Sequence, residues 1–153
     1  MKVIITYGTF DIFHVGHLNL FERMRALGDR LVVGVSTDSF NELKGKKTIM
    51  PYEERARIIS ALKCVDAVFP ENDWQQKRDD ILREKADIFV MGSDWAGHFD
   101  DLKSLCQVIY LPRTTGISST DIKNVIKGEV RDELIGIKNS LIGVQSKISD
   151  LLD

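Results

Sequence analysis

Short apolar runs alternate with longer amphipathic stretches along most of this chain. The runs are rich in valine and isoleucine and have the length of buried strands; they lie at residues 3–7, 30–36, 67–69, 87–91 and 107–111. The stretches between them carry apolar residues three and four apart, as on one face of a helix. The clearest are residues 17–27, the segment opened by Pro51 and residues 74–85. Strands joined by helices of this length pair in parallel, so the pattern predicts a doubly wound α/β sheet.

Residues 37–50 interrupt this alternation. They mix polar residues with three lysines and a glycine, which predicts a mobile loop. Pro51 follows at a first-turn helical position, where its missing N–H costs little. Further along, the run Ser-Ser-Thr-Asp at 118–121 fits a capping box ahead of a helix over 122–127.

The C-terminal segment has the seven-residue period of a coiled coil instead of the alternation of strands and helices. Gly136 and Gly143 weaken a helix there by about 1 kcal/mol each relative to alanine, so the segment needs a partner surface. It either packs on its own domain or joins subunits into a homodimer or higher homo-oligomer. We therefore divide the chain into a domain of residues 1–128 and an amphipathic helix of residues 129–153. Spacings of four and three form a coiled-coil seam over about three heptads, made of Val130, Leu134, Ile137, Leu141, Val144, Ile148 and Leu151.

Composition favours a soluble, cytoplasmic protein. Hydrophobic content of 43% and charged content of 29% are ordinary for a globular domain, and no segment has the roughly 20 apolar residues of a membrane span. The first apolar run breaks at Thr6 and Gly8, too early for a signal-peptide core. Cys64 and Cys106 lack metal-ligand spacing and are predicted to be small buried hydrophobes. A net charge of -2 gives no general attraction to nucleic acid or anionic lipid, and the local positive charge suits a small anionic ligand.

The densest chemistry follows the first strand, in the run GTFDIFHVGH at residues 8–17. A strand that enters a helix through such a turn brings the unpaired N–H groups of the helix N-terminus to one point, which favours phosphate. His14 and His17 add donors that can become positive near neutral pH. Asp38, Asp94 and Arg113 also follow strand ends, which meet at the ligand-binding edge of such a sheet. The sequence therefore predicts a polyphosphate site.

Two motifs make the chain resemble the HxGH nucleotidyltransferase superfamily. GTFD followed by HVGH is similar to its first signature, and RTTGISST at residues 113–120 is similar to the RTxGISST signature of its cytidylyltransferase branch. Between them, Trp74 with Lys77 and the run VMGSDW at 90–95 resemble glycerol-3-phosphate cytidylyltransferases. The resemblance covers residues 1–128 in order, and it implies a Rossmann-like nucleotidyltransferase fold.

That resemblance implies transfer of a cytidylyl group from CTP to sn-glycerol 3-phosphate, with Mg²⁺ accompanying CTP. The products would be CDP-glycerol, a precursor for teichoic acid or capsule, and pyrophosphate. The residues favour the same reaction class, because attack of one anion on another needs positioning and positive charge rather than a protein nucleophile. Two alternatives stay open: a cytidylyltransferase for another small phosphate or phosphonate, such as a polyol phosphate or phosphoethanolamine, and a non-catalytic nucleotide-binding oligomer.

The resemblance also implies roles for individual residues. Its catalytic set comprises His14, His17, Lys44, Lys46 and Arg113. A core role stays open for Phe10, as does a plain turn role for Gly16. The CTP contacts it implies are Gly8, Thr9, Phe10, His14, Val15, Gly16, His17, Lys46, Asp94, Arg113, Thr114, Thr115, Gly116, Ile117, Ser118, Ser119 and Thr120.

A second group of residues is expected on the acceptor side. Asp11, Lys44, Arg55 and Lys77 are its predicted members. A helix-surface salt bridge is the alternative for Arg55, and a solvated helix position is the alternative for Lys77. Two isolated carboxylates do not define a metal site, so the metal ligands stay unassigned.

Overall fold

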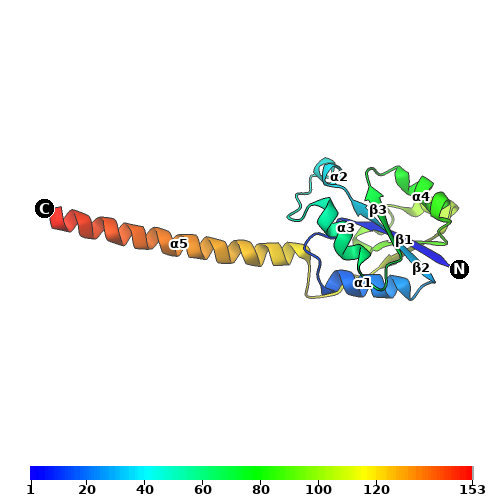
Figure 1. Ribbon diagram of the computed structural model, residues 1–153, viewed down its shortest axis with the longest axis horizontal. Helices are drawn as coiled ribbons and strands as arrows, with labels where there is room; N and C mark the ends of the chain where they lie inside the picture. Colours follow the sequence, from blue (N-terminus) through cyan, green and yellow to red (C-terminus); the bar gives the residue numbers. More distant parts are fainter. Residues whose placement is uncertain (153) are drawn as a thin grey trace. The chain divides into compact units, whose positions relative to one another are not determined.

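The computed structural model describes residues 1–152, and the side chains of residues 1–148 (Figure 1). The chain forms two compact units, one over residues 1–117 and one from Ser118 onward. The predicted boundary at residues 128 and 129 falls inside a single continuous helix, α5 (Ser119–Leu152). The first unit contains the sheet, and the second is formed by α5.

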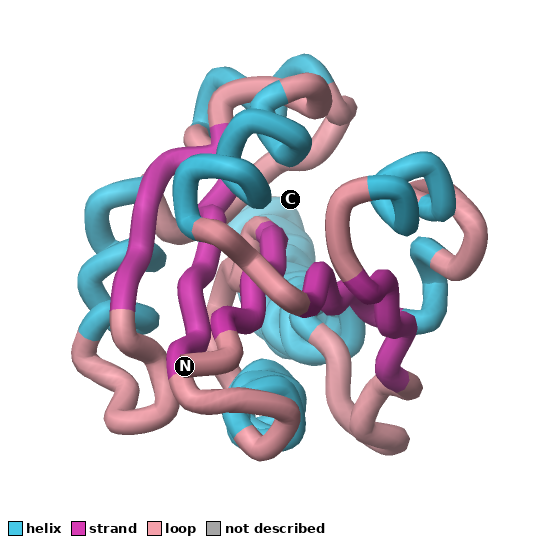
Figure 2. The backbone as a smooth tube through the Cα atoms, turned by 90° about the vertical axis from the view of Figure 1, so that its right-hand side faces the viewer, coloured by secondary structure: helices cyan, strands magenta, loops and turns pink. Residues whose placement is uncertain are grey.

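The first unit is built on one sheet of five parallel strands (Figure 2). The strand order is β3-β2-β1-β4-β5. The chain adds β2 and β3 on one side of β1 and then returns to add β4 and β5 on the other side. The predicted α/β parallel architecture is therefore confirmed. The strands are β1 (Val3–Gly8), β2 (Arg30–Ser36), β3 (Ala67–Glu71), β4 (Ile88–Gly92) and β5 (Gln107–Leu111).

Two hydrophobic clusters cover the two faces of the sheet. Alternate residues of β1 point to opposite faces, so that Ile4 lies in one cluster and Ile5 in the other. Phe21 of α1 and Ile59 of α3 pack in the cluster with Ile4, and Ile81 of α4 packs in the cluster with Ile5. The sheet is therefore doubly wound, with α1 and α3 on one face and α4 on the other.

The helices follow the predicted order with shifted ends. They are α1 (Val15–Arg25), α2 (Asp38–Leu43), α3 (Tyr52–Ser60) and α4 (Gln76–Glu84), with short 3₁₀ turns at Ser93–Trp95 and Asp100–Ser104. The expectation of a mobile loop over 37–50 is wrong in its first half, where the helix α2 forms. Thr37 caps α2 by accepting the N–H of Phe40, and buried Phe40 anchors it.

The cysteines differ in part from expectation. Cys64 and Cys106 are free thiols, half-buried rather than fully buried, and each packs against a different core cluster. Burial raises the pKa of both thiols, which keeps them in the neutral form at pH 7.

In the second unit, Ser118 caps α5 as predicted: its hydroxyl accepts the N–H of Asp121 and donates to the Asp121 carboxylate. No helix among the described residues is long and apolar enough to cross a membrane. The predicted seam residues from Val130 to Ile148 are all about half exposed or more. Leu151 lies outside the residues whose side chains are described.

Candidate active site

His14 and His17 form one rigid pair at the start of α1. The N–H of Gly16 donates to Nδ1 of His14 at 3.1 Å, and the N–H of His14 donates to Nδ1 of His17 at 3.4 Å. These two bonds form a reciprocal cap of the helix N-terminus. The imidazoles stack with ring centroids 3.9 Å apart. Because both Nδ1 atoms accept, this hydrogen-bond pattern assigns the proton of each neutral ring to Nε2, where it can be donated to an anion.

Both imidazoles are neutral at pH 7. Burial lowers the pKa of His17 to about 4, and His14 and Arg113 lower it too, while Asp11 acts in the opposite direction. Burial also lowers the pKa of His14. The expectation that these rings become positive near neutral pH is therefore wrong for the free protein. Burial disfavours the charged imidazoles, and the positive guanidinium of Arg113 disfavours a further charge on His17.

The loop between β1 and α1 is shaped by ring packing. Phe10 and Ile12 have φ of 52° and 49°, in the left-handed region that side chains rarely adopt. The Phe10 ring is buried between Phe21, at 4.9 Å between centroids, and the edge of His17, at 5.5 Å. A Cβ on Gly8 would lie 2.6 Å from the Phe10 ring. Phe10 therefore has the core role that the sequence left open, and it also supports His17.

Gly16 brings the two sequence motifs together. A Cβ at this position would lie 2.8 Å from the His14 ring and 3.0 Å from the Ile117 side chain. The absence of a side chain thus lets the imidazole and the end of the 113–117 segment close over the first turn of α1. This arrangement excludes the plain turn role for Gly16, since the glycine is needed for close packing inside a helix.

Asp11 and Arg55 hold the segment between α2 and α3 in place. The Asp11 carboxylate accepts the N–H groups of Ile49 and Met50, at 2.8 and 2.9 Å. The guanidinium of Arg55 donates to the carbonyls of Met50 and Thr9 and to the Asp38 carboxylate. Arg55 does form an ion pair, but its side chain is fully buried, so the alternative is wrong only in placing the pair on the helix surface. Both residues use their polar atoms to shape the loop on which Lys44 and Lys46 lie.

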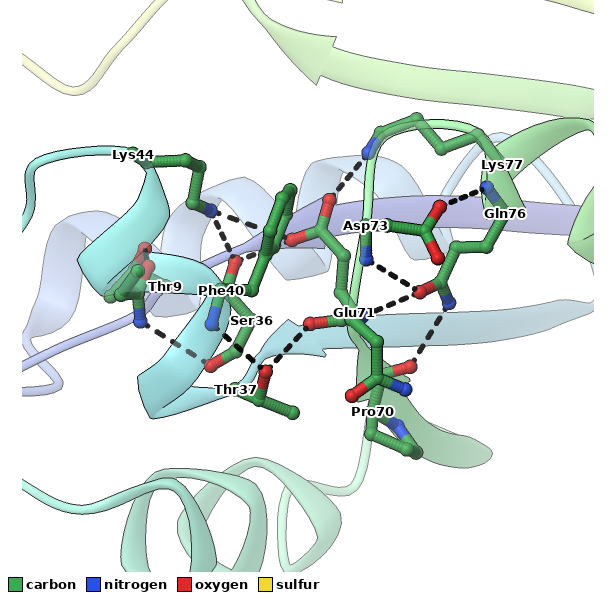
Figure 3. Close-up of polar contacts among 12 residues, drawn as sticks. Thr9, Ser36, Thr37, Phe40, Lys44, Pro70, Glu71, Asp73, Gln76 and Lys77 are labelled. Carbon is green, nitrogen blue, oxygen red and sulfur yellow. Dashed lines mark hydrogen bonds and ion pairs between the residues drawn. The ribbon is translucent and has the colours of Figure 1, made fainter.

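Lys44 and Lys77 share one buried carboxylate, Glu71 at the end of β3 (Figure 3). The Lys77 ammonium donates to Glu71 at 2.5 Å, while the Lys44 ammonium lies 3.7 Å from the other carboxylate oxygen. Lys44 also donates to the hydroxyl of Ser36 at 2.8 Å, and that hydroxyl donates to Glu71. Lys77 is 2% exposed, so its alternative as a solvated helix lysine is wrong.

Sequence reasoning missed Glu71, although a signal was present. The predicted third strand ends at Phe69, whereas the strand runs through Glu71. A carboxylate at the carboxyl end of a parallel strand is a candidate site residue. The signal was lost because the boundary was placed two residues too early.

Aromatic rings connect this lysine cluster with Arg113 and the turn after β4. Lys46 lies over the Trp95 ring at 5.8 Å, and Trp95 packs against Trp74 at 5.6 Å between centroids. Asp94, next to Trp95, receives two hydrogen bonds from Arg113. The segments after β1, β2, β4 and β5 therefore meet at the carboxyl edge of the sheet, where ligands of such sheets bind.

Some predicted contacts stay untested. Val15 is exposed on the first turn of α1, and Thr114, Thr115 and Gly116 form the turn after Arg113. Ser118, Ser119 and Thr120 belong to the second unit, so their contacts with CTP stay predictions. No group of three His, Cys, Asp or Glu side chains that could hold a metal ion occurs among the described residues.

Comparisons with known proteins agree with this geometry. The cytidylyltransferase-like family model matches residues 5–125. Glycerol-3-phosphate cytidylyltransferase of Bacillus subtilis (strain 168) is 55% identical over 128 residues, which cover 84% of this chain and 99% of the relative. The enzyme of the same name from Staphylococcus aureus (strain NCTC 8325 / PS 47) is 50% identical over 129 residues, covering 84% and 98%.

Solved structures agree on the fold. The lipopolysaccharide core biosynthesis protein from Thermoplasma volcanium GSS1 superposes with a TM-score of 0.68 at 28% identity, covering 74% of this chain and 98% of that one. A nicotinate-nucleotide adenylyltransferase-like structure from Vibrio parahaemolyticus, with a TM-score of 0.57 at 19% identity over 84% and 89% of the two chains, shares the fold alone. The family match and the sequence identity, together with the strand order and the His14–His17 pair at the start of α1, show that this chain belongs to the cytidylyltransferase-like family, among the relatives of glycerol-3-phosphate cytidylyltransferases.

Proposed function

We propose that this protein transfers the cytidylyl group of CTP to sn-glycerol 3-phosphate, forming CDP-glycerol and releasing pyrophosphate. The observation that carries the proposal is the meeting of two sets of anion-binding donors at one edge of the sheet. His14, His17 and Arg113 form the first set. Lys44 and Lys46 form the second, and Lys46 lies over Trp95, next to the Asp94 that pairs with Arg113. The high identity to enzymes of this activity over nearly their whole length supports the same assignment.

On the nucleotide side, the N-terminus of α1 binds the phosphates of CTP. The helix start contributes the positive end of its dipole, and the Nε2–H groups of His14 and His17 add neutral donors. Arg113 and Lys46 supply positive charge. These groups stabilise the charge that collects on the α-phosphate oxygens and on the leaving pyrophosphate.

On the acceptor side, Lys44 binds the phosphate of glycerol 3-phosphate, and Lys77 adds positive charge from its buried position beside Glu71. A phosphate oxygen attacks the α-phosphorus in line, a new P–O bond forms, and the bond to the β-phosphate breaks. No covalent enzyme intermediate forms, because the acceptor is itself a nucleophilic anion. Mg²⁺ would arrive with CTP and neutralise its phosphates. An ion of this kind is bound mainly by the substrate phosphates together with one or two carboxylates.

We infer that the reaction takes place in the cytoplasm, because both substrates are charged small molecules that do not cross a lipid bilayer unaided. A long polyanion such as nucleic acid does not suit the net charge of -2.

A pyrophosphate-release assay tests the proposal. The protein is incubated with labelled CTP, Mg²⁺ and one acceptor at a time, drawn from glycerol 3-phosphate, polyol phosphates, phosphoethanolamine and phosphonates. Turnover with glycerol 3-phosphate alone supports the proposal, and turnover only with another acceptor selects a different cytidylyltransferase. Tight CTP binding without any turnover selects the nucleotide-binding oligomer.

Two lysines on the same loop act as matched controls for one another. Lys44→Ala should raise the KM for the acceptor at least about tenfold and leave the KM for CTP nearly unchanged, as expected for loss of one charge-assisted contact. Lys46→Ala should do the reverse. If both variants raise both constants equally, the division into an acceptor side and a nucleotide side is wrong.

We also propose that copies of this chain assemble through residues 129–148 of α5. In the heptad register, Leu134, Leu141 and Ile148 take position a, and Val130, Ile137 and Val144 take position d; all six are half exposed or more. An apolar seam of this kind is stable in water only when another helix covers it.

Charge and side-chain shape indicate the arrangement of those copies. Glu133 takes position g and Lys138 the following position e, which pair between neighbouring helices in a parallel coiled coil. Leucine at a with isoleucine at d, as at Leu134 and Ile137, favours more than two strands. Ile135 and Ile142, both exposed, widen the stripe beside position e. We therefore expect a parallel assembly larger than a dimer.

A further inference from the structure

Glu71 occupies the centre of the lysine cluster. Its carboxylate is 3% exposed, and both of its oxygens have partners: one accepts from Lys77, and the other accepts from Ser36 beside Lys44 (Figure 3). A carboxylate this deeply buried is stable only when it is paired and hydrogen-bonded. The contacts therefore lock Glu71, Lys77 and Ser36 into one geometry.

The two lysines lie at different depths around this carboxylate. Lys77 is the inner one, with its ammonium 4.6 Å from the Tyr7 ring centroid and 4.8 Å from that of Trp74. Lys44 is the outer one, with a side chain that is 10% exposed and an ammonium 4.2 Å from the Phe40 ring centroid. An acceptor that enters from solvent thus meets Lys44 first.

Charge balance follows the same order. The inner lysine, Lys77, compensates the negative charge of Glu71 directly. The Ser36 hydroxyl donates to Glu71 and accepts from Lys44, so it links the carboxylate to the outer lysine. Without Glu71, the ammonium of Lys44 would face Lys77 and Lys46 with no anion between them. Neighbouring like charges repel strongly where water is excluded.

We propose that Glu71 is a positioning residue for the acceptor phosphate, which it serves by fixing the Lys44 ammonium through Ser36 and keeping it charged against Lys77. The proposal deepens the proposed function, on which it rests for the identity of the acceptor. It assigns Glu71 no contact with either substrate.

The pH dependence of acceptor binding gives the direct test. Burial lowers the pKa of Lys44 to about 8; Lys46 and Lys77 lower it as well, whereas Glu71 raises it. In the wild type, kcat/KM for the acceptor should fall as the pH rises through about 8, because Lys44 loses its charge. Glu71→Gln removes the raising influence, so the fall should move to lower pH. At pH 8 we expect a loss of at least about tenfold in kcat/KM for the acceptor and less than about threefold in that for CTP, on the scale of one charge-assisted contact.

Conservative and control variants separate positioning from general damage. Glu71→Asp keeps the charge, so it should restore the pH limb of the wild type while the KM for the acceptor stays raised. Asp80→Asn is the matched control: Asp80 is 2% exposed and accepts from Tyr7, and it touches neither Lys44 nor Ser36. It should leave the acceptor pH profile unchanged. The proposal is overturned if Glu71→Gln lowers kcat/KM equally for CTP and for the acceptor. It is also overturned if kcat/KM for the acceptor falls over the same pH range as in the wild type.

Two further measurements keep the test independent of folding and of the acceptor. If Glu71→Gln does not fold, Ser36→Ala breaks the link to Lys44 without leaving a charge unpaired, and it should raise the KM for the acceptor at least about threefold; an unchanged constant overturns the proposal. NMR titration of Lys44 in ¹³C-lysine-labelled protein needs no substrate. Failure of the wild type to use glycerol 3-phosphate would refute the proposed function, whereas an unchanged Lys44 titration in Glu71→Gln would refute this inference.

Discussion

Arg113 and Asp94 form a two-point ion pair, with Nε of Arg113 donating to Oδ1 of Asp94 at 2.9 Å and Nη2 donating to Oδ2 at 2.5 Å. The pair joins the turn after β4 to the segment after β5. Both side chains are exposed, so the pair contributes little to stability and its guanidinium is open to a stronger anion. Asp94 therefore orients Arg113 before the nucleotide arrives.

The first prediction concerns this pair. Arg113→Lys keeps the charge but loses the planar fork, and it should lower kcat/KM for CTP by about ten- to 100-fold. Asp94→Asn keeps the side-chain shape but removes the charge that pairs with Arg113. Because an exposed ion pair contributes little, kcat/KM for CTP should fall less than about tenfold. Steady-state kinetics at fixed acceptor concentration measures both. An Asp94→Asn loss as large as that of Arg113→Lys would show instead that Asp94 contacts CTP itself.

The second prediction concerns the histidine pair. His17→Ala removes a donor that acts on the transition state, so turnover should fall by at least about 100-fold while the protein stays folded. Single-turnover assays with saturating CTP report the chemical step directly. His98→Ala, an exposed histidine on the loop after β4, is the control and should retain normal turnover. A near-normal rate for His17→Ala would contradict its catalytic role.

The third prediction concerns protons taken up with CTP. His17 has a pKa of about 4 in the free protein, and a bound polyphosphate favours its charged form and raises that pKa. Binding of CTP near pH 6 should therefore take up protons, and the affinity should rise as the pH falls. Calorimetry in two buffers of different ionisation enthalpy measures the uptake. Because CTP itself titrates nearby, the informative quantity is the difference from His17→Asn, and a difference of zero contradicts the assignment.

The fourth prediction concerns Gly16. Alanine is the better helix former by about 1 kcal/mol, yet its Cβ would lie 2.8 Å from the His14 ring. Gly16→Ala should thus leave the melting temperature nearly unchanged but displace His14 and lower kcat by at least about tenfold, as loss of an aligned donor does. Gly128→Ala is the matched control, because a Cβ there meets nothing within 4 Å. Equal kinetics for the two variants would show that the close packing at Gly16 does not matter.

The fifth prediction concerns assembly. Truncation after Gly128 removes the whole seam, so light-scattering mass should fall from a multiple of the chain to a smaller multiple or to a monomer. Activity should persist, because the family model ends at residue 125. Leu141→Asp places a charge at position a and should have the same effect, whereas Asn139→Asp at position f should have none. A truncated protein with the same multiple would exclude the coiled coil.

The architecture was predictable because its signals are local. Runs such as residues 30–36 are apolar enough to be strands by themselves. The turn that follows Gly8 and the cap at Ser118 depend only on neighbouring residues. The order of these elements then restricts the sheet to a parallel one and places the histidine turn at its ligand-binding edge. The amino-acid sequence alone was therefore sufficient for the fold class, the reaction class and the histidine pair.

The depth of the long polar side chains was decided only by tertiary structure. Lys77 and Arg55 have the sequence pattern of surface helix residues, yet both are buried. Their partners come from distant segments: Arg55 bonds to Thr9, and Lys77 lies against Tyr7. A helical period shows which residues share a face, but the face that excludes water is set when strands and loops far apart in the chain meet. For the same physical reason, only the folded protein shows that the charge of Glu71 is balanced by two lysines.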